Sequence, residues 1–184
     1  MIVEDVSACQ AAADTRLWVE RAVIGLNLCP FAKAVQIKGQ VRYAVSDAVD
    51  EEGVLADLED ELMLICEADP DAIDTTLLIL PEALHDFYAF NDFGELSDRL
   101  LKRMRLVGSL QVATFHPAFQ FADTDPRDMG NYTNRSPYPT LHILREDSLD
   151  RAVEAFPEAE TIYERNIETM ESLGIEGWRK LMQA

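Results

Sequence analysis

The feature that most constrains the fold is a continuous apolar run over residues 76–80, which ends at Pro81. Five such residues between turn-forming residues predict a strand that is buried on both faces, as in a parallel sheet. Sheets of this kind are covered by helices, because neither face of the strand is suited to water. The run therefore predicts an α/β architecture.

The segments around this run alternate between strand and helix patterns. Further strands are expected over 41–45, 110–115 and 140–144. Amphipathic helices are expected over 8–27, 30–36, 48–68 and 92–105, followed by a short helix after Asp147 and a last one from Pro157 to Gly174. Strands separated by helices imply β-α-β units, so the first three strands are expected to be parallel. No helical pattern separates the third strand from the fourth, which we expect to be antiparallel or displaced.

These patterns together predict one domain of mixed α/β class over residues 1–184. It has a small central sheet of about four strands, the first three parallel, with helices on both faces and a helical C-terminal tail.

The charge of the chain is strongly acidic. Its 34 Asp and Glu residues against 16 Lys and Arg give a formal net charge of −18. This charge argues against nucleic-acid and anionic-membrane partners, which require a basic face. The sequence contains no apolar stretch of about 18 residues, so no transmembrane helix is expected. The amino-terminal residues lack a signal-peptide pattern.

The acidic residues are concentrated in one segment. Residues 47–74 contain twelve acids and no Lys or Arg. Two interpretations of the helix expected over 48–68 stay open: an interaction module that docks a basic partner, or a solvated face that keeps the protein in solution.

The three cysteines are Cys9, Cys29 and Cys66. An odd number of widely spaced cysteines without a CxxC pair predicts a reduced, cytoplasmic protein without a disulfide framework.

Residues 116–139 form an aperiodic segment that is too long for an ordinary connection. It holds four of the eight prolines and several aromatic residues. Structureless loops longer than about 12–15 residues are uncommon in compact domains unless they are functional or disordered, and the aromatic content argues against disorder. The segment is therefore the expected location of a functional site.

Three distant side chains are expected to meet at one edge of the sheet. Ligands of open α/β sheets bind beyond the carboxyl ends of the parallel strands, which is where His116 follows the third strand. A fourth strand that runs antiparallel would begin at the same edge and bring Arg135 with it. A helix over 30–36 that leads into the first strand would add Cys29. We therefore expect Cys29, His116 and Arg135 to share a cleft.

Cys29 and His116 are the candidate catalytic residues. Cys29 precedes Pro30 at the expected amino end of a helix, where the helix dipole and Lys33 would favour a thiolate nucleophile; the alternative is a small buried apolar residue. His116 could transfer protons; the alternative is an imidazole bonded to a loop carbonyl.

Arg135 is the centre of a candidate anion-binding group. A planar guanidinium among amide and hydroxyl donors suits a small anion. The alternative is an arginine that holds its own loop through backbone carbonyls. The expected substrate-binding residues are Lys33, Asn131, Asn134, Arg135, Ser136 and Tyr138.

A metal site has weaker support. His116, His142 and Asp123 are suitable ligand types, but they lack a closely spaced ligand pair. His142 lies within the fourth strand, which favours a structural role. No dinucleotide-binding or P-loop motif is present, so the cofactor is unknown.

Three blocks of the sequence resemble a known family. They cover 27–33 (NLCPFAK), 115–122 (FHPAFQFA) and 131–146 (NYTNRSPYPTLHILRE). Together they are similar to the uncharacterised bacterial family catalogued as domain of unknown function 1415, and the resemblance extends over nearly the whole chain. It implies a single-domain cytoplasmic protein and transfers no catalytic residue.

The leading hypothesis from the sequence is a small enzyme, or enzyme-like binder, of a small anionic metabolite that uses a Cys/His/Arg cleft. The alternatives are a non-catalytic interaction module that uses the acidic helix, and a metal-dependent enzyme that uses His116, His142 and Asp123. The oligomeric state is left open.

Overall fold

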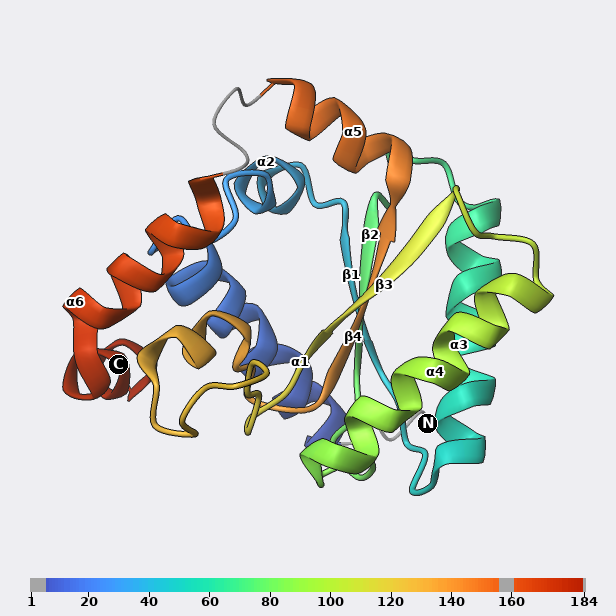
Figure 1. The fold of residues 1–184 in the computed structure, drawn as a ribbon. Coiled ribbons are helices and arrows are strands. Elements are labelled where there is room, and N and C mark those ends of the chain that lie inside the picture. The colour runs from blue at the N-terminus through green and yellow to red at the C-terminus, as the bar shows by residue number, and fades with distance from the viewer. Residues whose placement is uncertain (1–5, 156–160, 184) are drawn as a thin grey trace.

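The computed structural model describes residues 6–155 and 161–183 (Figure 1). The helices are α1 (Val6–Trp18), the π-helix η1 (Val19–Ile24), α2 (Ala32–Ile37), α3 (Glu51–Glu67), α4 (Phe87–Arg103), the 3-10 helix η2 (Met129–Asn134), α5 (Glu146–Ala155) and α6 (Ile162–Gln183). The strands are β1 (Val41–Val45), β2 (Thr75–Ile79), β3 (Leu110–Phe115) and β4 (Thr140–Arg145). The mixed α/β class, the four-stranded sheet and the C-terminal helix are as predicted.

The sheet is mixed and has the order β1-β2-β4-β3. β1 and β2 pair in parallel, whereas β4 is antiparallel to both β2 and β3. The prediction that the first three strands are parallel is therefore wrong, because only β1 and β2 form a parallel pair. Residues 116–139 contain no crossover helix, so β4 returns antiparallel and inserts between β2 and β3. β4 consequently begins at the edge where β2 and β3 end.

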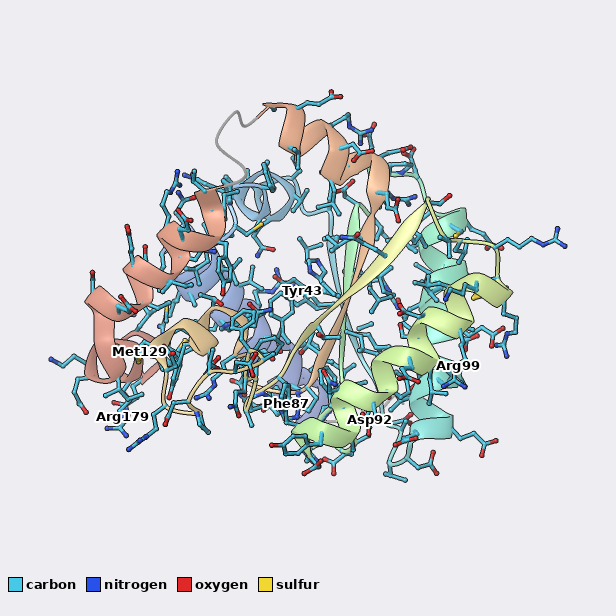
Figure 2. All side chains as sticks on the ribbon, in the orientation of Figure 1. Tyr43, Phe87, Asp92, Arg99, Met129 and Arg179 are labelled. Carbon is cyan, nitrogen blue, oxygen red and sulfur yellow. The ribbon has the colours of Figure 1, made fainter. Side chains whose placement is uncertain are left out.

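One face of the sheet packs tightly against α3 and α4, which lie together on the same side in Figure 1. Each helix begins at an aspartate cap: Asp50 accepts from the Gly53 N–H and Asp86 from the Ala89 N–H. The buried stripe of α3 consists of Val54, Leu58, Leu62 and Ile65, as its helical spacing predicted. Along α4, Phe90, Phe93 and Leu100 are buried, while Asp92 and Arg99, labelled in Figure 2, lie on its exposed side.

The opposite face carries α1, η1 and α6. Trp18, Val19 and Ala22 are buried against Leu77 of β2. The Trp18 and Phe115 rings meet edge to face at 5.1 Å between centroids. Alternate residues of each strand therefore serve two different helical layers.

The first helix changes its winding halfway. The Gly25 N–H donates to the Glu20 carbonyl, five residues back, at 3.1 Å, as in a π-helix. A Cβ atom on Gly25 would lie 2.1 Å from the Arg21 carbonyl oxygen, so this turn requires glycine. The single helix expected over 8–27 is thus an α-helix followed by a π-helix.

Two other helix boundaries differ from the predictions. α4 begins at Phe87 and not at 92, because Asp86 provides the cap. α6 continues past Gly174, which takes φ 62° and kinks the helix instead of ending it. The start expected at Pro157 lies outside the described residues. Within the described ranges, no helix has the length and apolar character needed to cross a membrane.

Candidate functional site

His116 is a buried residue of the loop and not an open catalytic group. Its side chain is bonded at both ring nitrogens: Nε2 to the Leu84 carbonyl at 3.1 Å and Nδ1 to the Ala118 N–H at 3.0 Å. Its ring packs against Phe90 and against Phe87, labelled in Figure 2. Desolvation lowers the pKa of His116, so the ring is neutral at pH 7. This geometry matches the structural alternative, an imidazole bonded to a loop carbonyl.

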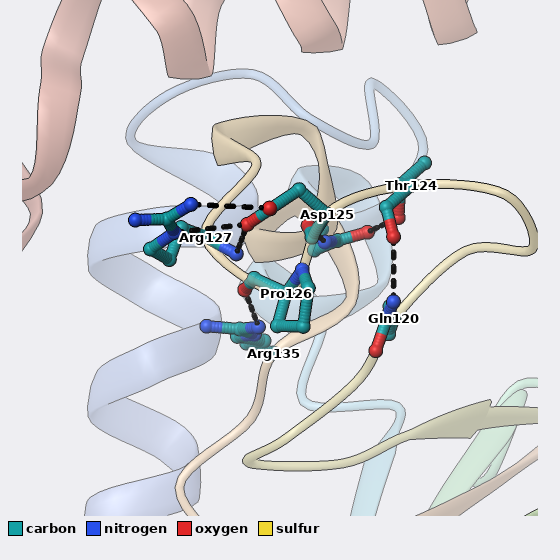
Figure 3. A network of polar contacts seen from close by, with 7 residues as sticks. Gln120, Thr124, Asp125, Pro126, Arg127 and Arg135 are labelled. Atoms are coloured by element: carbon teal, nitrogen blue, oxygen red, sulfur yellow. Dashed lines mark hydrogen bonds and ion pairs between the residues drawn. The ribbon is translucent and has the colours of Figure 1, made fainter.

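Arg135 holds the loop together from within (Figure 3). Its Nε donates to the Phe119 carbonyl at 3.1 Å. Its Nη2 donates to the Pro126 carbonyl at 2.7 Å, the bond drawn in Figure 3. The guanidinium also lies over the Tyr132 ring, 4.2 Å from its centroid. Two of its nitrogens thus donate to backbone carbonyls, as in the alternative of an arginine that holds its own loop.

The neighbouring polar side chains also bond within the protein. Asn131 is fully buried; its Oδ1 accepts from the Phe121 N–H and the Thr124 hydroxyl, and its Nδ2 donates to the Asp125 carbonyl.

Three more of the residues expected to bind substrate are also used internally. Asn134 accepts through Oδ1 from the Thr133 hydroxyl, Ser136 donates to the Tyr138 carbonyl, and the Tyr138 hydroxyl donates to Asp14. Most polar side chains of the aperiodic segment therefore form hydrogen bonds with other groups of the same segment. Its 3-10 helix packs on α6 through Tyr132 and Trp178.

A larger cavity than the hollow beside Arg135 lies over the sheet face that carries α1. Its volume is about 840 Å³, within the range of about 300–1,000 Å³ that is usual for ligand sites. The sheet contributes Val41, Thr75, Leu77, Ala113, Phe115, His142 and Leu144. The helices contribute Trp18, Val19 and Val23 from α1 and η1, Ala32 and Val35 from α2 with Lys38 at its C-cap, and Ser148, Leu149, Arg151 and Ala152 from α5. The lining is mainly apolar with a few polar groups.

Cys29 lies in the wall of this cavity, together with Pro30 and Phe31. It is partly exposed, whereas Cys9 and Cys66 are exposed. α2 begins only at Ala32, so Cys29 precedes the helix by three residues and does not sit at its first turn. Lys33 is exposed and is not part of the described lining.

The three residues expected to share one cleft are therefore separated. Cys29 lines the large cavity, and Arg135 lines a smaller hollow of about 360 Å³ beside Trp178. His116 belongs to neither described lining and packs against α4. The prediction of a single Cys/His/Arg cleft is not met, because His116 turns toward α4, whereas Arg135 lies in the hollow beside Trp178 and Cys29 in the wall of the other cavity.

His142 lies at the sheet floor of the cavity, beside Thr75. Its Nε2 lies 2.7 Å from the Thr75 Oγ1 on the neighbouring strand. Desolvation lowers the pKa of His142 to about 4, so the ring is neutral at pH 7. The sequence indicated which face of the sheet His142 takes, because it alternates with Leu141 and Ile143 in a strand. The sequence did not indicate that a cavity lies on that face.

The charged groups of the cavity are Lys38 just after α2, Asp71 and Asp74 before β2, Arg145 on β4 and Arg151 on α5. Ser148 joins two of them: it donates to Asp74 at 2.6 Å and accepts from Arg151 at 3.0 Å. Arg145 donates to the carbonyls of Ile65, Ala68 and Ile73. Lys38 forms no ion pair with a described residue, so its ammonium group is available at the cavity.

The proposed metal ligands are not assembled. His142 faces the cavity and His116 packs against α4, while Asp123 is exposed in the loop with φ 61°. In the described part of the chain, no three His, Cys, Asp or Glu side chains form a group that could hold a metal ion.

The family comparison gives one match. A family model described as a protein of unknown function (DUF1415) matches residues 10–180. Neither the search of curated proteins nor the search of solved structures found a match.

Proposed function

The chain belongs to the DUF1415 family, and we propose from its geometry that it binds a small organic acid in the cavity over the sheet. The observation that carries the proposal is the cavity itself, which combines an apolar lining with His142 on its floor and Cys29 in its wall. A cavity of this kind is the usual form of a small-molecule site.

The apolar lining indicates the body of the ligand. Trp18, Val19, Leu77 and Phe115 present hydrocarbon surface, and burying such surface stabilises a complex by roughly 25 cal/mol per Å² before the costs of association. An aromatic or branched aliphatic ligand therefore fits better than a sugar or a nucleotide.

The charges of the lining support an acidic group on that ligand. Among the described lining residues, the cations Lys38, Arg145 and Arg151 outnumber the carboxylates Asp71 and Asp74 by one, although the chain as a whole carries a charge of −18. Lys38, which has no described ion-pair partner, is the group we assign to the carboxylate of the ligand.

The proposed setting is the cytoplasm. Cys9, Cys29 and Cys66 are all free thiols, which suits a reducing compartment.

We do not propose the acidic helix α3 as a docking surface for a basic partner. Glu59 and Glu61 pair with the chain's own Arg103 and Arg42, at 2.6 and 2.7 Å, which favours the interpretation of α3 as a solvated face.

Cys29 provides the test, with the other two thiols as internal controls. The probes are phenylacetate and the three hydroxyphenylacetates, which carry one hydroxyl at different ring positions. The measurements are the alkylation rate of each cysteine, by mass spectrometry, and the temperature of thermal unfolding. We expect a bound probe to raise Tm and to slow alkylation of Cys29, while the rates of Cys9 and Cys66 stay unchanged.

Two substitutions on α5 localise the binding. Ala152 lines the cavity, whereas Val153 on the same helix is 51% exposed. Ala152→Trp should fill the cavity and abolish probe binding, and Val153→Trp should leave it intact. Binding that survives Ala152→Trp, or that leaves Cys29 unprotected, would contradict the proposal.

A further inference from the structure

The hydrogen bonds around His142 determine which ring nitrogen carries its proton. The Thr75 hydroxyl donates its one proton to the Ile143 carbonyl at 2.7 Å. In the 2.7 Å contact with His142 Nε2, Thr75 Oγ1 can therefore only accept. The proton of a neutral His142 consequently lies on Nε2, and Nδ1 carries a lone pair.

The Nδ1 atom has no hydrogen-bond partner among the described residues. No further hydrogen bond of the His142 ring is found, and its aromatic contact is with Phe115 at 5.9 Å between centroids. The fully buried side-chain atoms without a partner in the described chain are those of Thr15, Thr76 and Ser97. His142 is not among them, and its side chain lines the cavity.

An acceptor in this position favours a particular kind of ligand. A polar atom in a mainly apolar cavity costs free energy unless a hydrogen bond satisfies it. The neutral ring, whose pKa is about 4 because of desolvation, can accept a hydrogen bond but does not act as a cation at pH 7.

We infer that His142 Nδ1 anchors the ligand by accepting a hydrogen bond from one of its O–H or N–H groups, with Thr75 as the residue that positions the ring. This inference rests on the proposed function and narrows its ligand class to hydroxy- or amino-substituted organic acids with an apolar body. A site built around a hydrogen bond rejects an analogue that lacks the bonding group more strongly than an apolar site rejects a small change of size.

The first test needs no ligand. ¹⁵N NMR of the histidine ring distinguishes the two tautomers, and we expect His142 to show a protonated Nε2 and an unprotonated Nδ1 at pH 7. In Thr75→Val, which keeps the branched shape but removes Oγ1, we expect this preference to be lost. A protonated Nδ1 in the unsubstituted protein would overturn the inference.

The second test compares matched probes. Among the three hydroxyphenylacetates, we expect at least one isomer to bind about tenfold more tightly than phenylacetate, the gain of one net hydrogen bond. His142→Phe should remove this difference between the hydroxyphenylacetates and phenylacetate. The control is His85→Phe, because His85 is exposed and does not belong to the described lining.

The outcomes separate the inference from the proposed function. If all four probes protect Cys29 but none of the hydroxy isomers binds more tightly than phenylacetate, the inference is overturned and the proposed function stands. If no probe binds or protects Cys29, the proposed function fails for this ligand class, and the anchoring role of His142 fails with it. A hydroxyl preference that survives His142→Phe would overturn the inference alone.

Discussion

The two faces of the sheet differ in how their helices are built. On one face, α3 and α4 have 17 residues each, begin at aspartate caps and bury continuous apolar stripes. On the other, η1 is a π-helix, α2 has six residues, and α5 has no buried residue. The cavity of about 840 Å³ lies on this second face.

This difference shows how one set of strands can serve two purposes. β4 directs Leu141 and Ile143 into the packed core and His142 into the cavity. The packed face holds the larger buried cluster, and the looser face leaves room for the cavity in which we propose that a ligand binds.

The largest difference in unfolding free energy is expected between two leucine truncations, one on each face of the sheet. Leu62→Ala removes a fully buried side chain of α3 and should cost about 2–5 kcal/mol of unfolding free energy. Leu149→Ala at the cavity should cost less than about 1 kcal/mol, because that side chain is only partly buried. Urea denaturation measures both, and equal losses would contradict the assignment of stability to the α3/α4 face.

The pH dependence of stability is expected to report His142. Its pKa is about 4 in the folded chain because of desolvation and about 6.5 when unfolded. Between these values only the unfolded chain binds the proton, so the free energy of unfolding should fall as the pH drops from about 6.5 to 4. The expected loss is about 3 kcal/mol at most.

His142→Phe isolates this contribution. Because His116, whose pKa is also lowered by desolvation, titrates in both proteins, the difference between the two pH profiles belongs to position 142. Parallel profiles would show that the cavity floor is not desolvated.

A smaller effect is expected in the loop over 116–139. Arg135→Gln removes the donors to the Phe119 and Pro126 carbonyls and should cost about 1–2 kcal/mol, measured by thermal unfolding, without changing probe binding. The matched control is Arg127→Gln, whose partner Asp125 is exposed, and it should be nearly neutral. Weaker probe binding in Arg135→Gln would restore the anion-binding interpretation of this residue.

The smallest effect is expected at the outer side of the packed face. The exposed ion pair of Arg103 with Glu59 should contribute about 0.5 kcal/mol in a double-mutant cycle, and less at high salt. A coupling energy of several kcal/mol would mean that α3 and α4 are joined by charge as much as by their core.

The sequence predicted the elements better than their arrangement. The run over 76–80 correctly indicated a buried strand, and the stripe of α3 gave its buried residues, since both follow from the local period of apolar residues. The insertion of β4 between β2 and β3 depends on contacts between distant segments, for which a single sequence has no local signal. The family resemblance was confirmed over residues 10–180.

The site was harder to predict for a similar reason. Asn131 and Arg135 belong to residue types that bind anions, but the same donors satisfy backbone carbonyls in a long loop, and residue type does not distinguish the two uses. The cavity is formed by side chains from distant elements. Gly25, which lies inside a helical pattern, is a local sign of the irregular winding of η1 beside the cavity.

Arg145 gives the binding floor a mechanical property. It lies three residues after His142 on β4 and donates to the carbonyls at the end of α3 and before β2. A ligand that displaced β4 would have to break these hydrogen bonds, so they restrain the position of the sheet floor. If the cavity binds ligands as proposed, its adaptation to ligands of different shape would involve α2 and α5, which line it beside the sheet, and not the sheet itself.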